Sequence, residues 1–148
     1  MHDIRHRIGT TAAPAEVFAA VATRDGLRRW WTADVRGDDS PGGSLGFHFG
    51  GTEPSAVMEV VDVAPGRRVV WRCTAGPDEW VDTTFTFEVR SDDAETALLF
   101  TNAGWSRPVP FLHHCSTKWA YFLLGLKATL EGGPSVAFPD DAAISAWG

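Results

Sequence analysis

The sequence is poor in three features that mark common classes of protein. Its 148 residues include only two cysteines, too few for the disulfide framework of a small secreted domain. Its 13 Lys and Arg residues are outnumbered by 19 Asp and Glu residues, and the resulting net charge of -6 disfavours binding to nucleic-acid phosphates or to an anionic membrane surface. No apolar run approaches the roughly 20 residues that a bilayer-spanning helix needs. We therefore expect neither nucleic acid nor membrane as a partner.

The N-terminal segment also lacks the apolar stretch of a secretion signal. Residues 1–10, MHDIRHRIGT, are too polar for one. Together with two cysteines that we expect to be reduced thiols, this predicts a cytoplasmic location. The chain length suits a single domain with one hydrophobic core. We expect this domain to span residues 1–134 and to be followed by an irregular C-terminal segment, residues 135–148, called the tail below.

The first third of the chain changes its pattern several times. Apolar and polar residues alternate over residues 3–8, which predicts a half-buried strand. Pro14 suits the first position of a short helix. Thr23 is a suitable N-cap for a second short helix over residues 24–31. Residues 35–44, VRGDDSPGGS, have the composition of a loop.

The remainder divides into strands and one long helix. Residues 44–104 contain a series of short segments in which apolar and polar residues alternate, which predicts a run of strands. Pro65-Gly66 suits the centre of a type II turn between two of these strands. Consecutive strands joined by short turns pair antiparallel. Apolar residues recur at three- and four-residue steps from Leu112 to Glu131, which predicts an amphipathic helix. The pattern indicates an α+β fold in which this helix covers the apolar face of the sheet.

Four segments resemble the SRPBCC (START-like, birch-pollen-allergen-like) superfamily and, within it, the activator of heat-shock protein 90 ATPase homologue type. They are IGTTAAPAEVFAAVATRDGLRRWWT (8–32), VAPGRRVVW (63–71), WVDTTFTFEV with TALLFTNAGW (80–89 and 96–105) and CSTKWAYFLLGLKATLEGG (115–133). The resemblance covers about residues 2–134. It implies a helix-grip fold, in which a curved antiparallel sheet of six or seven strands wraps around the long C-terminal helix, with two short helices after the first strand. It also implies a cavity between sheet and helix. Asn102 stands where many members of this type carry a histidine.

The tripeptide His113-His114-Cys115 has the residue types of a metal or catalytic site. Neighbouring residues on a helix diverge by about 100°, and a helical zinc pair uses i and i+4 spacing, where Thr117 and Lys118 stand here. We therefore predict no metal. Cys115 lies on the apolar face of the predicted helix and is expected to be a buried thiol. A nucleophilic Cys115 with a histidine base stays an alternative, although both histidines are expected to point away from it.

The abundant residue is tryptophan, with seven copies, and most aromatic residues fall on faces predicted to point inward. Such large rings either fill a core or line a cavity, and we expect part of the set to line one. Asn102 and indole N–H groups would orient a ligand there. The predicted ligand-binding residues are Trp30, Trp31, Phe47, Phe49, Trp71, Cys73, Trp80, Phe85, Phe100, Asn102, Trp105, Cys115, Trp119 and Phe122.

These features favour a binding protein over an enzyme. Acid–base catalysis needs two titratable groups that converge on one reacting centre, and the sequence offers no such pair, so we assign no catalytic residue and no cofactor. The main hypothesis is that an apolar small molecule, lipid-like or aromatic, binds in a Trp-lined cavity. The alternatives are a cyclase-, aromatase- or hydrolase-like enzyme that uses the same cavity, and a co-chaperone or stress-response interaction protein. An exposed sheet edge could support a homodimer.

Overall fold

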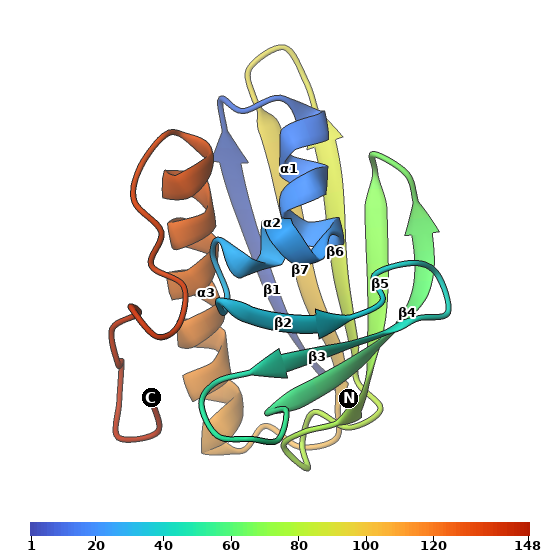
Figure 1. Ribbon diagram of the computed structural model, residues 1–148, viewed down its shortest axis with the longest axis vertical. Helices are drawn as coiled ribbons and strands as arrows, with labels where there is room; N and C mark the ends of the chain where they lie inside the picture. The colour runs from blue at the N-terminus through green and yellow to red at the C-terminus, as the bar shows by residue number, and fades with distance from the viewer.

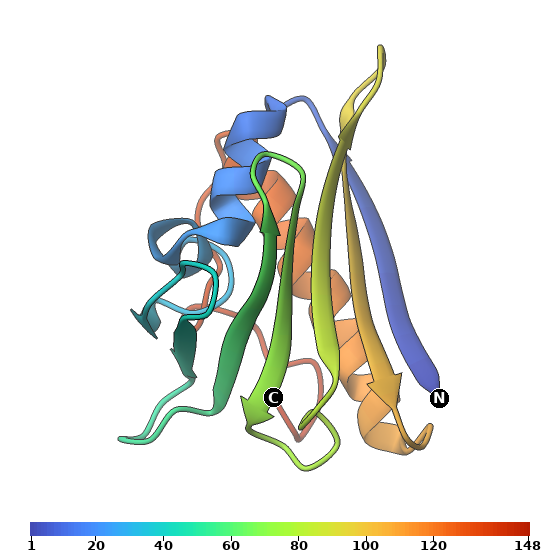
Figure 2. The ribbon, with the colours of Figure 1, turned by 90° about the vertical axis from the view of Figure 1, so that its right-hand side faces the viewer.

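A seven-stranded antiparallel sheet curves around one long helix in the computed structural model, which describes residues 1–148 (Figures 1 and 2). Two short helices follow the first strand, as predicted, and the α+β helix-grip fold is confirmed. The elements are β1 (His2–Thr10), α1 (Pro14–Ala22), α2 (Arg24–Arg28), β2 (Asp34–Gly37), β3 (Ser44–His48), β4 (Ala56–Ala64), β5 (Arg68–Ala75), β6 (Thr84–Ser91), β7 (Thr96–Trp105) and α3 (Pro110–Leu130).

The strand order is β1-β7-β6-β5-β4-β3-β2, so β2 to β7 pair in chain order and β1 joins at β7. The turn at Pro65-Gly66 is formed as predicted, with the Arg67 N–H donating to the Ala64 carbonyl at 2.9 Å and Gly66 at a φ of 77°. Strands β1 and β2 are the two edges of the sheet. None of the helices is both long and apolar enough to cross a bilayer.

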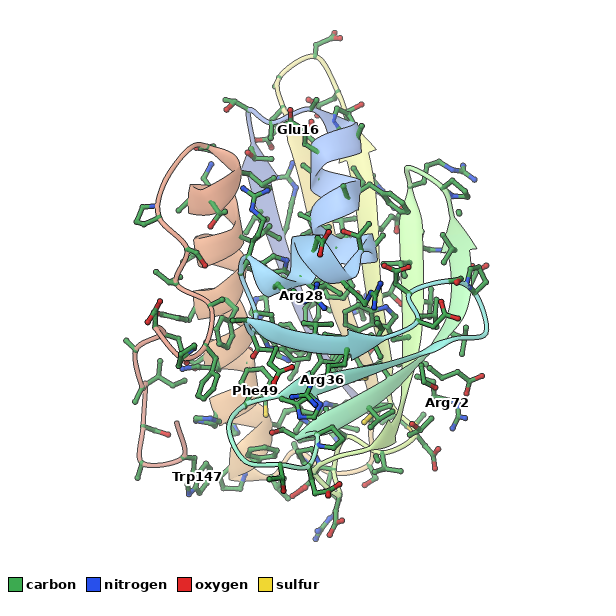
Figure 3. All side chains as sticks on the ribbon, viewed as in Figure 1. Glu16, Arg28, Arg36, Phe49, Arg72 and Trp147 are labelled. Atoms are coloured by element: carbon green, nitrogen blue, oxygen red, sulfur yellow. The ribbon has the colours of Figure 1, made fainter.

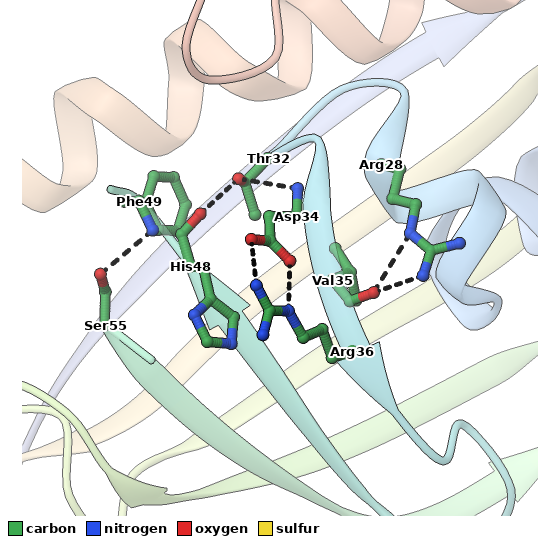
Figure 4. Close-up of polar contacts among 8 residues, drawn as sticks. All are labelled: Arg28, Thr32, Asp34, Val35, Arg36, His48, Phe49 and Ser55. Carbon is green, nitrogen blue, oxygen red and sulfur yellow. Dashed lines mark hydrogen bonds and ion pairs between the residues drawn. The ribbon is translucent and has the colours of Figure 1, made fainter. Parts of the chain in front are cut away.

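The prediction of a loop over residues 35–44 is wrong at its start, where the chain forms β2 and pairs with β3. Val35 is buried, and its carbonyl accepts hydrogen bonds from the Arg28 guanidinium, at 3.1 Å from Nε (Figure 4). The partners of this short edge strand come from β3 and from the end of α2. Because composition reports only local preference, it does not reveal a strand that depends on such distant partners.

The core lies between the concave face of the sheet and the inner faces of α1 and α3. It is one cluster of 29 buried hydrophobic residues. Trp119 of α3 stands at its centre and packs against rings from β6, β7 and the end of α2, including Phe100 at a centroid distance of 4.5 Å and Trp31 at 4.8 Å. Helix α3 begins at Pro110, two residues before the predicted start, because Pro is well suited to the first helical position.

The junction of α1 and α2 depends on two small side chains. The Thr23 hydroxyl accepts a hydrogen bond from the Gly26 N–H at 3.0 Å, which confirms the predicted N-cap of α2. Gly26 lies so close to α1 that a Cβ there would be 2.1 Å from the Ala19 carbonyl oxygen and 2.6 Å from the Ala20 Cα. This close approach sets the position of α2 and of the two tryptophans that follow it.

Replacing Gly26 by alanine is expected to lower the free energy of unfolding by about 1–3 kcal/mol, because backbone atoms of α1 must move to admit the methyl group. Urea denaturation followed by circular dichroism measures the change. The control is Gly46→Ala in β3, where the nearest atom to an added Cβ is 3.6 Å away. Equal destabilisation by both substitutions would contradict the proposed clash.

Candidate ligand-binding cleft

A cleft of about 490 Å³ lies between α3, the ends of β3 and β4, the β5–β6 loop and the tail. Of the 18 residues that line it, 11 are hydrophobic. Phe49 lies at the end of β3 that is nearest α3, and Trp147 lies near the end of the tail, beside the start of α3 (Figure 3). The volume and the mainly apolar lining fall in the range of small-molecule sites.

Six of the predicted ligand-binding residues line the cleft. Three of them recur at helical steps along one face of α3, one follows α2, one follows β3 and one lies in the β5–β6 loop. They are Cys115, Trp119, Phe122, Trp31, Phe49 and Trp80. Residues distant in the sequence therefore contribute rings to one apolar floor.

The other predicted ligand-binding residues lie in the closed core and do not line the cleft. Each is at most 1% exposed. They are Trp30, Phe47, Trp71, Cys73, Phe85, Phe100, Asn102 and Trp105. The rings of this set pack against one another and against Trp119, for example Trp71 on Phe47 at 5.4 Å, so the space that a central cavity would need is filled.

Asn102 is occupied by hydrogen bonds within the protein. The Trp105 indole N–H donates to its carbonyl oxygen at 2.7 Å, and its amide nitrogen donates to the Thr83 hydroxyl at 3.0 Å and to the Thr84 carbonyl at 3.1 Å. The Thr83 hydroxyl in turn donates to the Trp80 carbonyl at 2.7 Å. This chain of bonds holds the loop that carries Trp80, so Asn102 supports one wall of the cleft from behind.

The cleft also contains polar residues that sequence patterns did not identify as lining. His114 contributes to the wall, and its Nδ1 lies 2.9 Å from the Ser145 hydroxyl of the tail. His114 was expected to point away from the Cys115 face, and it lines the same cleft as Cys115 because the cleft and tail extend around that side of α3. His113 is exposed and lies outside the cleft.

The chemistry of the cleft cysteine is that of a buried thiol. Burial raises the pKa of Cys115 to about 12, against the opposing effect of the Trp80 indole N–H. At neutral pH Cys115 is therefore protonated and a weak nucleophile. Burial and the nearby Lys118 ammonium lower the pKa of His114. No group of three or more His, Cys, Asp or Glu side chains comes close enough together to hold a metal ion.

Lys118 is the cation of the cleft. Its ammonium lies 2.8 Å from the Asp141 carboxylate and donates to the Ala142 carbonyl at 2.6 Å. The same ammonium is 5.1 Å from the ring centroids of both Tyr121 and Phe122. The Lys118 and Asp141 side chains are only 15% and 12% exposed, which makes this the least exposed ion pair of the protein. The pair joins α3 to the tail.

Replacing Asn102 by alanine is expected to lower the free energy of unfolding by about 1–3 kcal/mol, because the Trp105 indole N–H loses its partner in the core. Thermal or urea denaturation measures this. Thr101→Ala is the control, since the neighbouring Thr101 is half-buried on the opposite face of β7. An Asn102→Ala protein as stable as the control would show that the network contributes nothing.

Comparison with known proteins gives a family and several similar structures. Residues 11–131 match the family described as activator of Hsp90 ATPase homolog 1-like protein. The solution structure of the Aha1 dimer from Colwellia psychrerythraea is 37% identical, with a TM-score of 0.80 over 90% of this chain and 98% of that chain. No curated protein matches the sequence.

Two further structures share the fold at lower identity. Protein SSP2350 from Staphylococcus saprophyticus is 17% identical, with a TM-score of 0.77 over 96% of this chain and 98% of its own. CalU16 from Micromonospora echinospora is 21% identical, with a TM-score of 0.77 over 95% of this chain and 72% of its own. The family match covers most of the chain and ends before the tail. The chain belongs to the activator of Hsp90 ATPase homologue 1-like family, in agreement with the resemblance of its four sequence segments.

Proposed function

We propose that this protein binds an apolar small molecule, lipid-like or aromatic, in the cleft beside α3. The observation that carries the proposal is an apolar depression of about 490 Å³ floored by the rings of Trp31, Trp80 and Trp119. Each Å² of apolar ligand surface removed from water there contributes roughly 25 cal/mol. The rigid rings lose little conformational freedom when a ligand binds, so side-chain ordering removes less of this contribution.

The titratable groups of the cleft favour binding over catalysis. Lys118 and Asp141 neutralise one another, and the Cys115 thiol is protonated at neutral pH. His114 is directed to the Ser145 hydroxyl. An enzyme-like role would need an acid and a base that converge on one reacting atom. Lys118, Asp141 and His114 instead contact other groups of the protein, and the Cys115 thiol keeps its proton.

A fluorescence titration with the neutral probe N-phenyl-1-naphthylamine tests the proposal. Phe49→Ala removes a ring from the wall of the cleft and is expected to raise the dissociation constant by about five-fold, corresponding to roughly 1 kcal/mol. Phe18→Ala is the matched control, because Phe18 is also half-buried but lies on α1, away from the cleft. Its dissociation constant should equal that of the wild type.

Native mass spectrometry of freshly purified protein gives the complementary result. A co-purifying apolar compound supports the proposal. A protein that is empty, binds no probe and is stabilised by no hydrophobic compound in a thermal-shift panel would overturn it.

The comparisons favour a second candidate role. The family is named for activators of the Hsp90 ATPase, and the relative from Colwellia psychrerythraea is described as a dimer. We infer contact with an Hsp90-type chaperone, and a homodimer, as the alternative. Strands β1 and β2 each pair with only one other strand, and a sheet edge is a place where a second copy could add.

Two measurements test this alternative. Sedimentation equilibrium is expected to show twice the monomer mass at high protein concentration, and a constant monomer mass would exclude the homodimer. Addition of the protein to an Hsp90 from the same source is expected to raise its ATPase rate. An unchanged rate over a wide concentration range would remove the chaperone role.

A further inference from the structure

The tail has a firmly held first part and a weakly held second part. Near its start, the Phe138 N–H donates to the Trp31 carbonyl and the Phe138 carbonyl accepts from the Ala33 N–H, both at 2.9 Å, while Ala137 is buried. Residues 140–148 contain no buried residue and no helix or strand. In Figure 1 this part runs along α3 toward the start of the helix, where the cleft lies.

The second part is held mainly by polar contacts to α3. Lys118 bonds to the Asp141 carboxylate and the Ala142 carbonyl, and the Tyr121 hydroxyl accepts from the Ala142 N–H at 2.9 Å. Trp147 lies against the start of α3 but remains 62% exposed. Little apolar surface therefore opposes detachment of this part.

Lys118 would be left without an anionic partner if the tail moved away. Its ammonium lies above two aromatic rings in a mainly apolar cleft, where an unpaired charge is unfavourable. Lys118 is one of only two lysines in the chain and the only Lys or Arg that lines the cleft. An opened cleft thus presents an apolar floor with one cation at its wall, which is complementary to an apolar molecule that carries one negative charge.

We propose that residues 140–148 are a displaceable cover of the cleft, and that the ligand is an apolar molecule with a single anionic group, such as a carboxylate, which replaces Asp141 on Lys118. This inference rests on the proposed small-molecule function and specifies its ligand. Asp141 then acts as an internal competitor. An anionic ligand competes with it for Lys118, whereas a neutral ligand does not.

Two probes with the same ring skeleton separate these cases. 1-Anilinonaphthalene-8-sulfonate carries one negative charge, and N-phenyl-1-naphthylamine carries none. Asp141→Asn is expected to tighten binding of the sulfonate about five-fold, and Lys118→Met to weaken it by a similar factor. The neutral probe gains only from the opening of the cover and should tighten to a similar extent in both variants, so the ratio of sulfonate affinity to neutral-probe affinity rises in Asp141→Asn and falls in Lys118→Met.

Asp140→Asn is the matched control for charge. It removes the same unit charge from the neighbouring residue, which is exposed and forms no ion pair. It should leave both dissociation constants unchanged. Equal effects of Asp140→Asn and Asp141→Asn would overturn the inference, and so would a sulfonate affinity that Lys118→Met leaves unchanged. In either case, binding of the neutral probe would still support the proposed function. Failure of both probes to bind any form of the protein would overturn both.

Cysteine labelling tests the displacement of the cover directly. Cys115 lines the cleft and is 4% exposed, whereas Cys73 is fully buried in the core and lies outside the cleft. Alkylation by iodoacetamide, followed by peptide mass spectrometry, should be slow at both residues in the wild type. Asp141→Asn and Lys118→Met are expected to accelerate labelling of Cys115 several-fold and to leave Cys73 unchanged. Equal acceleration at both cysteines indicates general loosening and contradicts a local cover.

Discussion

The packing of Trp119 against both the sheet and the end of α2 is the contact on which the rest of the structure depends. One ring joins three parts of the fold, with Phe100 of β7 and Trp31 after α2 both within 5 Å between centroids. A side chain of this size holds α3 away from the sheet, and the space on its inner side is filled by further rings. Beside the end of β3 and the start of β4 the small side chains of Ser55 and Ala56 do not fill the same spacing, which leaves a cleft there.

The walls of this cleft differ in how firmly they are built. Trp80 is held from behind by the hydrogen bonds that run through Thr83 to Asn102 in the core. The tail has no regular structure beyond Phe138 and depends on a few polar contacts with α3. Entry of the proposed ligand would therefore displace only the weakly held wall, with little loss of packing elsewhere.

Local patterns predicted the elements of the fold well, because most of them depend on neighbours in the chain. The Thr23 cap, the turn at Pro65-Gly66 and the apolar face of α3 are such cases. Strand β2 was missed because its partners lie in β3 and at Arg28. The strand residues predicted to bind a ligand, such as Phe47, Trp71 and Phe100, do face inward, but they lie in the closed core and not in the cleft. Alternation does not distinguish a ring in a solid core, such as Trp71, from one beside a cavity, because that depends on what packs opposite.

Lys118 is the cleft residue whose importance sequence patterns could have indicated. It lies three residues after Cys115 and four before Phe122, so helical geometry puts it on the same face as those two cleft residues. A cation on an apolar helix face requires a partner, and the acidic tail supplies one in Asp141. The net charge of -6 does not prevent an anion from taking that place, because charges more than about 8 Å away are screened at physiological ionic strength. Within the cleft the local field of Lys118 dominates, so under the proposed mode of binding the identity of its partner would determine whether the cleft is covered or occupied.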